Sequence, residues 1–255
     1  MKKKAIIFDV DGTIMPSGAD GDFMPSIRFK KAIKNLQKDY VIALASGRSK
    51  KYADYLIRDI GLIDECVISA GTEIIDPATM DIIWSQLIPL HTHGHIAACL
   101  DGASAVIATQ KSGHAQNDSF TLMQFMADDA TALYFMGIDP EVADALEKDL
   151  LHPELTIINM HHYDDYSLRD LHIHSSKASK EHAVNELLRR REIDRKDSIV
   201  IGDGANDLHL FKAGGYKIAM GNAAPELKAE ADLIIGDVKD DALAIYLEKL
   251  ITENV

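Results

Sequence analysis

Two carboxylates, those of Asp9 and Asp11, follow a short apolar run near the start of the chain. The run, residues 5–8, reads Ala-Ile-Ile-Phe, and Gly12 comes directly after the second aspartate. A short, continuous apolar segment that ends in a turn residue predicts a buried strand, here a central strand of a parallel sheet. Open α/β sheets bind their ligands at the carboxyl ends of the strands, which is where both aspartates fall.

Two carboxylates so close together at the mouth of an apolar strand repel each other and lose hydration. A bound cation would compensate for both effects. Mg²⁺ is the natural candidate, because it prefers oxygen ligands and often binds together with a substrate phosphate. The alternative is that Asp9 and Asp11 only cap a helix or shape a turn, and a lone pair of aspartates favours that alternative. The choice therefore depends on what the other strands carry at their ends.

Two further predicted strands also end in polar residues. Residues 40–45 lead into Ser-Gly-Arg at 46–48, and residues 198–201 lead into Gly-Asp-Gly-Ala-Asn-Asp at 202–207. The carboxyl ends of parallel strands converge on one edge of a sheet. That edge would gather four carboxylates, those of Asp9, Asp11, Asp203 and Asp207. Four such charges in a small volume are strongly unfavourable without a cation, so the set favours a metal site.

These residue types suit phosphoryl transfer. The carboxylate of Asp9 can attack a phosphoryl group and form an aspartyl phosphate, and Mg²⁺ would neutralise the charge that otherwise repels the attack. Asp11, two residues further on, is expected to face the same way, and could protonate the leaving oxygen and later deprotonate water. Ser46 offers a hydroxyl, and the backbone N–H groups beside Gly47 suit phosphate oxygens. A lysine would hold the phosphate and Asp9 together.

The elements that must position these residues alternate as β-α-β-α-β over residues 1–80, with a third strand at 66–69, which predicts a doubly wound parallel sheet. The pattern changes near Asp76 and Pro77 to half-buried strands and short helices, and the first pattern resumes after Ser176. We therefore expect an α/β fold. It comprises a Rossmann-like doubly wound parallel core, residues 1–80 and 176–255, and an inserted α+β domain with a largely antiparallel sheet, residues 81–175.

Within the insert, the polar run at 111–118 predicts a loop, and a helix is expected through residues 120–126, whose methionines are spaced as core fillers. The insert is also rich in histidine. His172 and His174 would share one face of a strand and could bind a metal, but no neighbouring Cys or carboxylate completes a zinc set, which favours ordinary polar surface. The other histidines noted there are His91, His93, His95, His161 and His162.

The composition limits the class of protein. The 255 residues carry a net charge of −13, so no nucleic acid or anionic membrane is expected as a partner, although small anionic substrates can bind where cations are concentrated. Cys66 and Cys99 are the only cysteines; they exclude a disulfide scaffold and suit a reducing compartment. The apolar run after the N-terminal lysines is too short for a signal peptide, and no segment approaches the roughly 20 apolar residues of a membrane span. We therefore expect a cytoplasmic protein.

Four motifs, in order, resemble those of haloacid dehalogenase-like phosphatases. They are Asp-Val-Asp-Gly-Thr at 9–13, Ala-Ser-Gly-Arg at 45–48, Ser-Lys at 179–180 and Gly-Asp-Gly-Ala-Asn-Asp at 202–207. The tail from 218 to 232, with Met-Gly-Asn-Ala at 220–223 and Pro-Glu-Leu-Lys at 225–228, is similar specifically to the Cof-type subfamily. The likeness covers the whole of the expected core.

The resemblance implies roles for individual residues. Asp9 would be the nucleophile and a Mg²⁺ ligand, and Asp11 would be the general acid and base, binding the metal through its backbone carbonyl. Asp203 would be the third protein ligand, and Asp207 would support the metal site. The phosphate-binding residues would be Ser46, Gly47, Lys180 and Asn206.

Lys177 is an alternative to Lys180, but the family pattern places the lysine after a serine and directly before a helix, which favours Lys180. The long separation between Ser46 and Lys180 puts the insert between the second and third motifs, where related proteins carry a cap that closes over the core and selects the leaving group.

In one departure from the family pattern, Ser-Ala-Gly-Thr at 69–72 stands where many relatives have Asn-Gly, which bears on specificity at the rim of the site. Arg48 could contact substrate or pair locally, and both interpretations stay open.

Three functions are compatible with these motifs. The leading hypothesis is a Mg²⁺-dependent phosphatase of small phosphorylated metabolites, such as sugar phosphates or similar monoesters. The second is a phosphomutase or phosphotransferase on sugar phosphates, which would pass the phosphoryl group from Asp9 to a second hydroxyl. The third is a sugar-phosphate sensor without turnover, against which the presence of both Asp9 and Asp11 argues.

Overall fold

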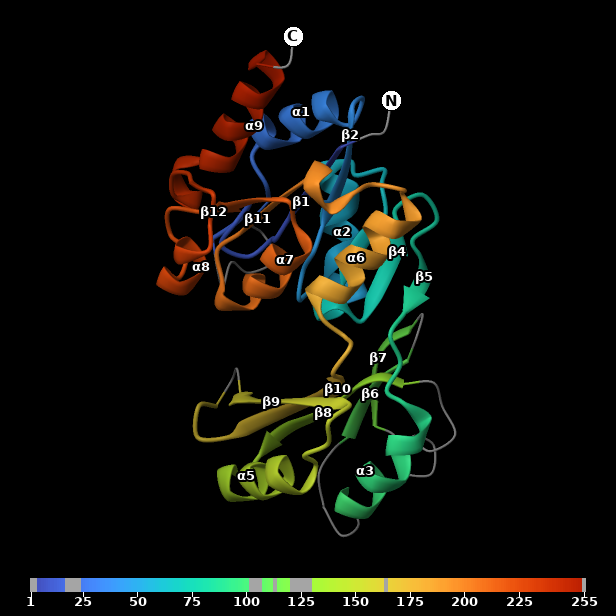
Figure 1. Cartoon of the computed structure of the whole chain (residues 1–255). Coiled ribbons are helices and arrows are strands. Elements are labelled where there is room, and N and C mark those ends of the chain that lie inside the picture. Colours follow the sequence, from blue (N-terminus) through green and yellow to red (C-terminus); the bar gives the residue numbers. More distant parts are fainter. Residues whose placement is uncertain are drawn as a thin grey trace. The chain divides into compact units, whose positions relative to one another are not determined.

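The computed structural model describes residues 4–16, 24–100, 107–111, 114–119, 130–162 and 165–253. The chain divides into two compact units, which are described one at a time (Figure 1). The core unit consists of Met1–Ile83 and Ser179–Val255, and the insert unit consists of Trp84–Ala178.

The core unit is built on a five-stranded sheet in which all neighbouring strands are parallel. In spatial order the strands are β13 (Leu233–Ile234), β12 (Tyr216–Ala219), β11 (Ser198–Gly202), β1 (Lys4–Phe8) and β2 (Tyr40–Leu44). Residues 5–8 of β1 are fully buried between β11 and β2. A central strand covered on both faces needs apolar side chains on both, which explains the unbroken apolar run in the sequence.

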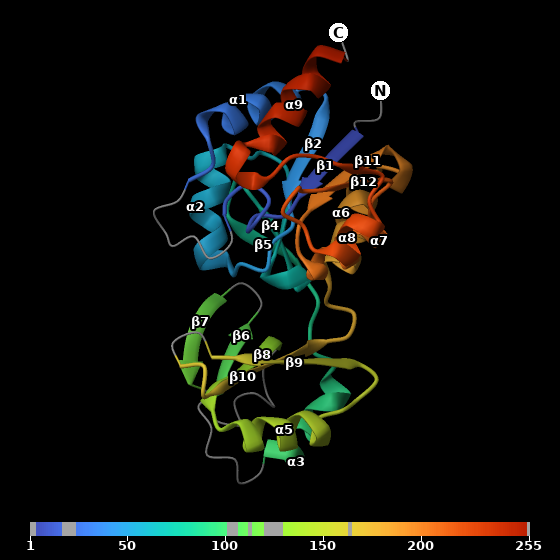
Figure 2. The same cartoon turned by 90° about the vertical axis from the view of Figure 1, so that its left-hand side faces the viewer.

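Helices cover both faces of this sheet (Figure 2). One face carries α1 (Ile27–Leu36), α2 (Lys50–Ile60) and α9 (Ala242–Glu253), and the other carries α6 (Lys180–Arg190), α7 (Leu208–Ala213) and α8 (Pro225–Ala229). Helix α1 packs against α9, and α6 packs against α7. The side chains of Ser26 and Ser179 cap α1 and α6 by accepting a hydrogen bond from the N–H group three residues further on. The predicted α/β class with a doubly wound parallel core is thus confirmed.

A second, three-stranded sheet differs from the prediction. It contains β3 (Cys66–Ile68), β4 (Glu73–Asp76) and β5 (Asp81–Ser85), and β3 pairs with β4 in antiparallel fashion. Only an isolated parallel bridge, between Ala45 and Val67, joins β3 to the end of β2. The predicted third strand is therefore present, but it does not extend the parallel sheet, because a single 3-10 turn at Ser69–Gly71 reverses the chain and β4 pairs with β3. Asp76 and Pro77, expected near a change of domain, lie at the turn between β4 and β5.

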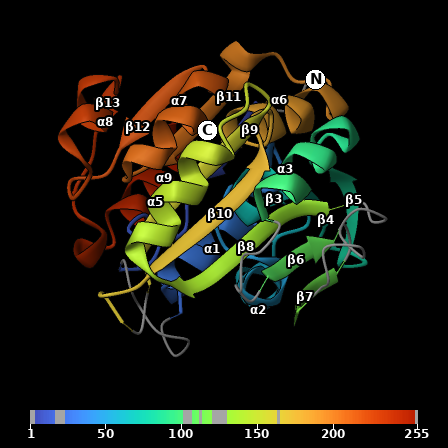
Figure 3. The same cartoon turned by 90° about the horizontal axis from the view of Figure 1, so that it is seen from below.

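The insert unit contains an antiparallel sheet with the strand order β7-β6-β8-β10-β9. Its strands are β6 (Ile107–Lys111), β7 (His114–Ser119), β8 (Ala130–Ile138), β9 (Leu155–His161) and β10 (Arg169–Ser175). Helices α3 (His93–Leu100) and α5 (Pro140–Asp149) lie over one face of it, in front of β8 and β10 in Figure 3. On that face Phe135 and Leu171, which are paired in register, belong to the buried apolar core together with Ile96 and Leu146.

Two predictions within the insert have different outcomes. The polar run at 111–118 was expected to form a loop, but residues 114–119 form β7, an edge strand that pairs with β6. A strand that borders solvent tolerates polar side chains, so composition misled the prediction. The helix expected through residues 120–126 lies outside the described residues. Among the helices that the structure describes, none has both the length and the apolar character needed to cross a membrane.

Adjacent residues of β8 provide a test of the insert core. Phe135 is fully buried in that core, whereas its neighbour Met136 is 36% exposed. We expect Phe135→Ala to lower the free energy of unfolding by about 3–5 kcal/mol, because it leaves a cavity, and Met136→Ala to lower it by less than about 1 kcal/mol. Urea unfolding of the two variants measures both values. Equal effects at the two positions would contradict the proposed packing.

Candidate active site

Three neighbouring strands of the core sheet end close to residues with catalytic potential. Asp9 directly follows β1, Asp203 directly follows β11, and Ser46 lies two residues beyond β2. Because β1 pairs in parallel with both β11 and β2, these three ends lie side by side at one edge of the sheet. The backbone N–H of Asp9 donates to the carbonyl of Ile201 at 2.9 Å, which fixes the chain at this edge.

A buried lysine joins two of the carboxylates. The Nζ atom of Lys180, the first residue of α6, donates to Oδ1 of Asp9 and to Oδ1 of Asp207, both at 2.6 Å. The three side chains are only 4%, 7% and 0% exposed, respectively. Charges this deeply buried are stable only when paired, so both carboxylates depend on Lys180 and the lysine depends on them.

Burial shifts the pKa values of this group. Desolvation raises the pKa of Asp9 to about 7, although the nearby Lys180 ammonium opposes the rise. Burial alone would lower the pKa of Lys180, but the two carboxylates outweigh it and raise that pKa. Desolvation also raises the pKa of Asp203 to about 6, against the hydrogen bond from Thr13. One lysine therefore does not compensate for all the carboxylates of the site.

The same carboxylates could hold a metal ion. Asp9, Asp203 and Asp207 each offer a carboxylate oxygen, and these three oxygens lie within 4.8 Å of one another. Oxygen-only ligands suit Mg²⁺, and a divalent cation would stabilise the ionised form of the two groups whose pKa values are raised. The donor set thus fits Mg²⁺.

Two residues that the sequence did not single out hold Asp203 in place. Thr13 donates from Oγ1 to Oδ1 of Asp203 at 3.0 Å. Asn222 donates from Nδ2 to the carbonyl of Gly12 at 2.8 Å and reaches Oδ2 of Asp203 at 3.4 Å. Both residues lie inside motifs quoted for the family likeness, but only their contacts reveal this positioning role.

Asp11 lies differently from the expectation. Its carboxylate does not join the group of Asp9, Asp203 and Asp207 but accepts two hydrogen bonds from Arg48, at 2.9 Å from Nε and 2.6 Å from Nη2. Arg48 also donates to the hydroxyl of Tyr55 at 2.8 Å. The expected cluster of four carboxylates is therefore a cluster of three, because the guanidinium fork satisfies the charge of Asp11 nearby. Of the two interpretations left open for Arg48, the structure shows local pairing.

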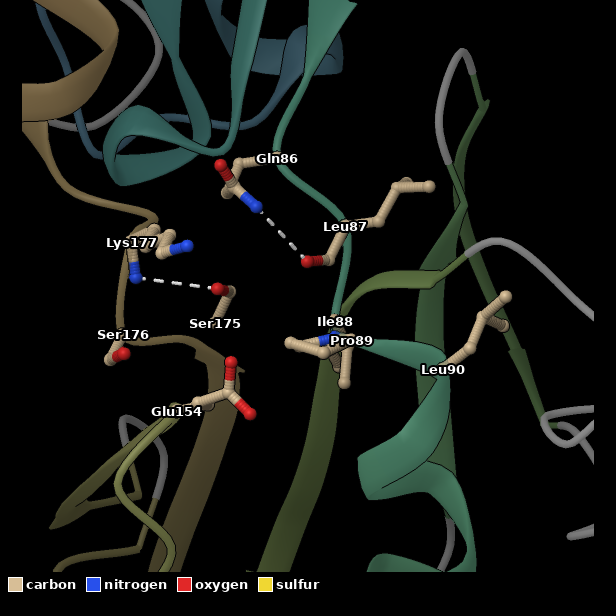
Figure 4. Close-up of a pocket in the computed structure, with 9 residues that line it drawn as sticks. All are labelled: Gln86, Leu87, Ile88, Pro89, Leu90, Glu154, Ser175, Ser176 and Lys177. Carbon is tan, nitrogen blue, oxygen red and sulfur yellow. Dashed lines mark hydrogen bonds between the residues drawn. The ribbon is translucent and has the colours of Figure 1, made fainter.

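The expected phosphate-binding residues differ in their surroundings. Ser46 is 1% exposed, and its Oγ accepts a hydrogen bond from the Arg48 backbone at 3.1 Å. Gly47 is exposed with open space around its Cα, and Asn206 is exposed in the turn that precedes α7. Lys180 is the lysine that contacts Asp9, whereas Lys177 belongs to the insert unit, where it lines a pocket beside Ser175 (Figure 4).

A strained turn, residues 69–71, is hydrogen-bonded to the loop that carries Ser46 and Arg48. Ser69, Ala70 and Gly71 all have positive φ angles, of 52°, 56° and 98°. The N–H of Ser69 donates to the Arg48 carbonyl at 2.8 Å, and the N–H of Ala70 donates to the Ser46 carbonyl at 3.0 Å. Side-chain-bearing residues adopt such angles only when their surroundings impose them. The departure from the family pattern at 69–72 thus lies on a turn that holds the loop after β2.

Fold and site together define a doubly wound α/β protein with an acidic centre at the carboxyl edge of its sheet, whose carboxylates could hold a cation. A family model described as haloacid dehalogenase-like hydrolase matches residues 6–121 and 105–247 of the chain. The chain belongs to this family. The predicted Cof-type recognition and the predicted enzyme class, a phosphoric monoester hydrolase, are confirmed.

Individual relatives agree with this assignment. "Putative phosphatase YkrA" from Bacillus subtilis is 24% identical over 281 residues, which cover 98% of this chain and 98% of the relative. A phosphoglycolate phosphatase from Nitrosopumilus maritimus is 35% identical over 79 residues, which cover 31% of this chain and 34% of that protein.

Solved structures share the fold along nearly the whole chain. TM0651 from Thermotoga maritima has a TM-score of 0.79 at 18% sequence identity, with 97% of both chains covered. BT4131, described as a sugar phosphatase of subclass IIB, has a TM-score of 0.73 at 17% identity, covering 97% of this chain and 99% of that one. At such identities the likeness shows the fold.

The raised pKa values predict how Mg²⁺ affinity changes with pH. Below pH 6 both Asp9 and Asp203 carry protons that a metal must displace, between about 6 and 7 only Asp9 does, and above 7 neither does. We expect the Mg²⁺ affinity to fall on acidification by up to about tenfold per pH unit for each displaced proton. Isothermal titration calorimetry at pH 5.5, 6.5 and 8 measures this. A constant affinity over that range would contradict the raised pKa values.

Gly71 lies where the turn at 69–71 contacts the start of α6, so its substitution tests whether this turn holds Lys180 in place. A Cβ atom there would lie 2.2 Å from the backbone carbon of Ser179 and 2.5 Å from the backbone nitrogen of Lys180. We expect Gly71→Ala to displace Lys180 and lower kcat by about 100-fold, measured with an aryl phosphate. Gly61 is the matched control, because its φ is also positive, at 76°, but nothing lies within 4 Å of its Cβ position. Gly61→Ala should cost about 1 kcal/mol of stability and leave kcat unchanged; similar kcat values for both variants would refute this role of the turn.

Proposed function

We propose that the chain is a Mg²⁺-dependent phosphatase that hydrolyses small phosphorylated metabolites, sugar phosphates or similar monoesters, through an aspartyl phosphate on Asp9. The observation that carries the proposal is the buried triad in which Lys180 bridges Asp9 and Asp207. It holds one carboxylate at the mouth of the sheet beside a cation that can attract phosphate. The names of the relatives, a sugar phosphatase and phosphoglycolate phosphatases among them, support small phosphorylated substrates.

In the first step an Oδ atom of Asp9 attacks phosphorus, the bond from phosphorus to the leaving oxygen breaks, and Asp11 gives that oxygen a proton. In the second step Asp11 takes a proton from water, whose oxygen attacks the phosphorus, and Asp9 leaves as a carboxylate. Mg²⁺ bound by Asp9 and Asp203, with the Asp11 carbonyl and support from Asp207, would supply charge neutralisation for both steps. Ser46, Gly47, Lys180 and Asn206 would hold the phosphoryl oxygens.

Arg48 has a defined place in this scheme. Its paired hydrogen bonds fix the position of the Asp11 carboxylate, the group that accepts a proton from water in the second step. The hydroxyl of Tyr55 accepts a further hydrogen bond from Arg48 and so holds the guanidinium in place. In the first step Asp11 acts instead as the proton donor, so we expect its ion pair with Arg48 to open before that step.

We assign substrate selection to the insert, expected from the sequence at residues 81–175. Family members carry the leaving-group contacts on such a domain, and here the insert has its own sheet and apolar core. Lys180 begins α6 directly after the insert ends, at the start of the second stretch of the core unit.

Asp9→Asn is the direct test of the reaction. We expect Mg²⁺-dependent hydrolysis of p-nitrophenyl phosphate by the natural chain and a loss of at least about 1,000-fold in kcat for Asp9→Asn, because an amide is no nucleophile. Asp81→Asn, at an exposed carboxylate, is the matched control and should retain activity. Phosphate release from a panel of sugar phosphates and other monoesters then ranks substrates.

Three results would overturn the proposal. Retained turnover in Asp9→Asn would remove the assigned nucleophile. Interconversion of sugar-phosphate isomers without phosphate release would identify a mutase. Tight binding of a sugar phosphate without turnover would identify a sensor.

A further inference from the structure

The insert unit gathers histidines that lie far apart in the sequence. His91 lies in the turn before α3, His95 and Cys99 lie on α3, and His152 and Glu154 lie between α5 and β9. The sequence pattern pointed instead to His172 and His174, with no cysteine or carboxylate near them. The structure brings the missing sulfur and carboxylate to a different set of histidines.

The contacts run through this cluster without a break. Both ring nitrogens of His95 lie 4.0 Å from Sγ of Cys99, one helical turn further on. The rings of His95 and His152 have their centroids 5.6 Å apart, and those of His152 and His91 are 6.3 Å apart. Nε2 of His91 is hydrogen-bonded to Oε2 of Glu154. Five side chains with metal-binding chemistry thus adjoin one another within a single unit.

Imidazole nitrogen together with a thiolate is the donor set preferred by Zn²⁺ and similar transition ions. In a tetrahedral zinc site, a sulfur and a nitrogen ligand lie about 3.6 Å apart. The 4.0 Å between Cys99 and His95 is close to that value, and two residues four apart on a helix share one face. This pair therefore forms half of a tetrahedral site with little adjustment.

The other half requires side-chain rotation. Among the described residues, the group whose ligand atoms already lie within 4.8 Å of one another is the aspartate group of the core unit. The side chain of His91 is 65% exposed and that of Glu154 is 40% exposed, so neither is fixed by packing. Turning about the side-chain bonds of His91 and His152 would bring their nitrogens toward the pair on α3.

The surroundings of the cluster also favour a cation. Sγ of Cys99 donates to the Asp149 carbonyl at 3.2 Å, so the thiol lies beside a carbonyl oxygen as well as beside the ring of His95. Glu154 accepts a hydrogen bond from His91, an arrangement in which a carboxylate orients a ligating imidazole.

We propose that His91, His95, Cys99 and His152 form a binding site for Zn²⁺ or a similar divalent transition ion, with Glu154 as the positioning carboxylate. The site lies wholly within the insert unit and is independent of the Mg²⁺ chemistry proposed for the core unit. It would tie the turn before α3, α3 itself and the segment after α5 together.

Titration of the full-length protein with Co²⁺, in saturating Mg²⁺, tests the proposal. Cobalt bound to a thiolate gives a charge-transfer absorption that oxygen ligands do not give. Co²⁺ bound to the aspartates of the core unit therefore does not contribute to this band. Cys66, the other cysteine, is fully buried. We expect the band to saturate at one Co²⁺ per chain and to disappear when Zn²⁺ displaces the cobalt.

Variants identify the ligands. Cys99→Ser should abolish the band, and His95→Ala and His152→Ala should each weaken Co²⁺ binding at least about tenfold. His161→Ala, at an exposed histidine of β9 that stacks on Tyr166, is the matched control and should bind as the natural chain does. Asp9→Asn should keep the band, which separates this site from the catalytic proposal. Zn²⁺ should also raise the melting temperature of the natural chain and not that of Cys99→Ser.

Several results would overturn the proposal. These are no thiolate band at saturating Co²⁺, a band that survives Cys99→Ser, or natural affinity in both His95→Ala and His152→Ala. Circular dichroism of each variant confirms that the fold is retained, so a lost band reports a lost ligand.

Discussion

The ion pair that Lys180 makes with Asp9 and Asp207 is the interaction on which the core unit depends. It connects the end of β1, the start of α6 and the turn before α7, segments that are distant in the sequence. Loss of one partner from a buried pair costs about 3–5 kcal/mol, because the remaining charge is left without compensation. The same geometry leaves excess negative charge, so the arrangement that secures the fold also prepares a cation site. Stability and chemistry therefore share one cause.

The backbone around this ion pair is shaped to hold it. Gly12 has a φ of 85°, and a Cβ atom there would lie 1.9 Å from a carboxylate oxygen of Asp203. The turn at 69–71 accepts positive φ angles in Ser69 and Ala70, which cost about 1–3 kcal/mol each. It is hydrogen-bonded to the loop after β2 and also contacts the start of α6. Close approach and strain of this kind are typical of sites in which side chains must be fixed before the substrate arrives.

The sequence predicted the features that follow from periodicity and from a general rule of α/β sheets. Apolar runs located β1, β2 and β11, and the rule that strand ends converge brought Asp9, Asp203 and Asp207 into one site. The rule that strand ends converge did not predict the pairing of Asp11 with Arg48, since the direction of a side chain beyond a strand end depends on its partners. Nor could an apolar run show that β3 pairs mainly with β4 in antiparallel fashion, because both kinds of sheet bury the same residues. The histidine cluster is invisible to local spacing, because among the described residues three strands and a helix separate His152 from Cys99.

The central claim is that Asp9 accepts the phosphoryl group. Acid quenching of the natural chain during turnover of a ³²P-labelled phosphate monoester, followed by proteolysis and mass spectrometry, tests it most directly. The account predicts a phosphorylated peptide that contains Asp9, sensitive to hydroxylamine as acyl phosphates are, and absent from Asp9→Asn. Label on any other residue would contradict it, as would rapid phosphate release with no labelled enzyme at any quench time.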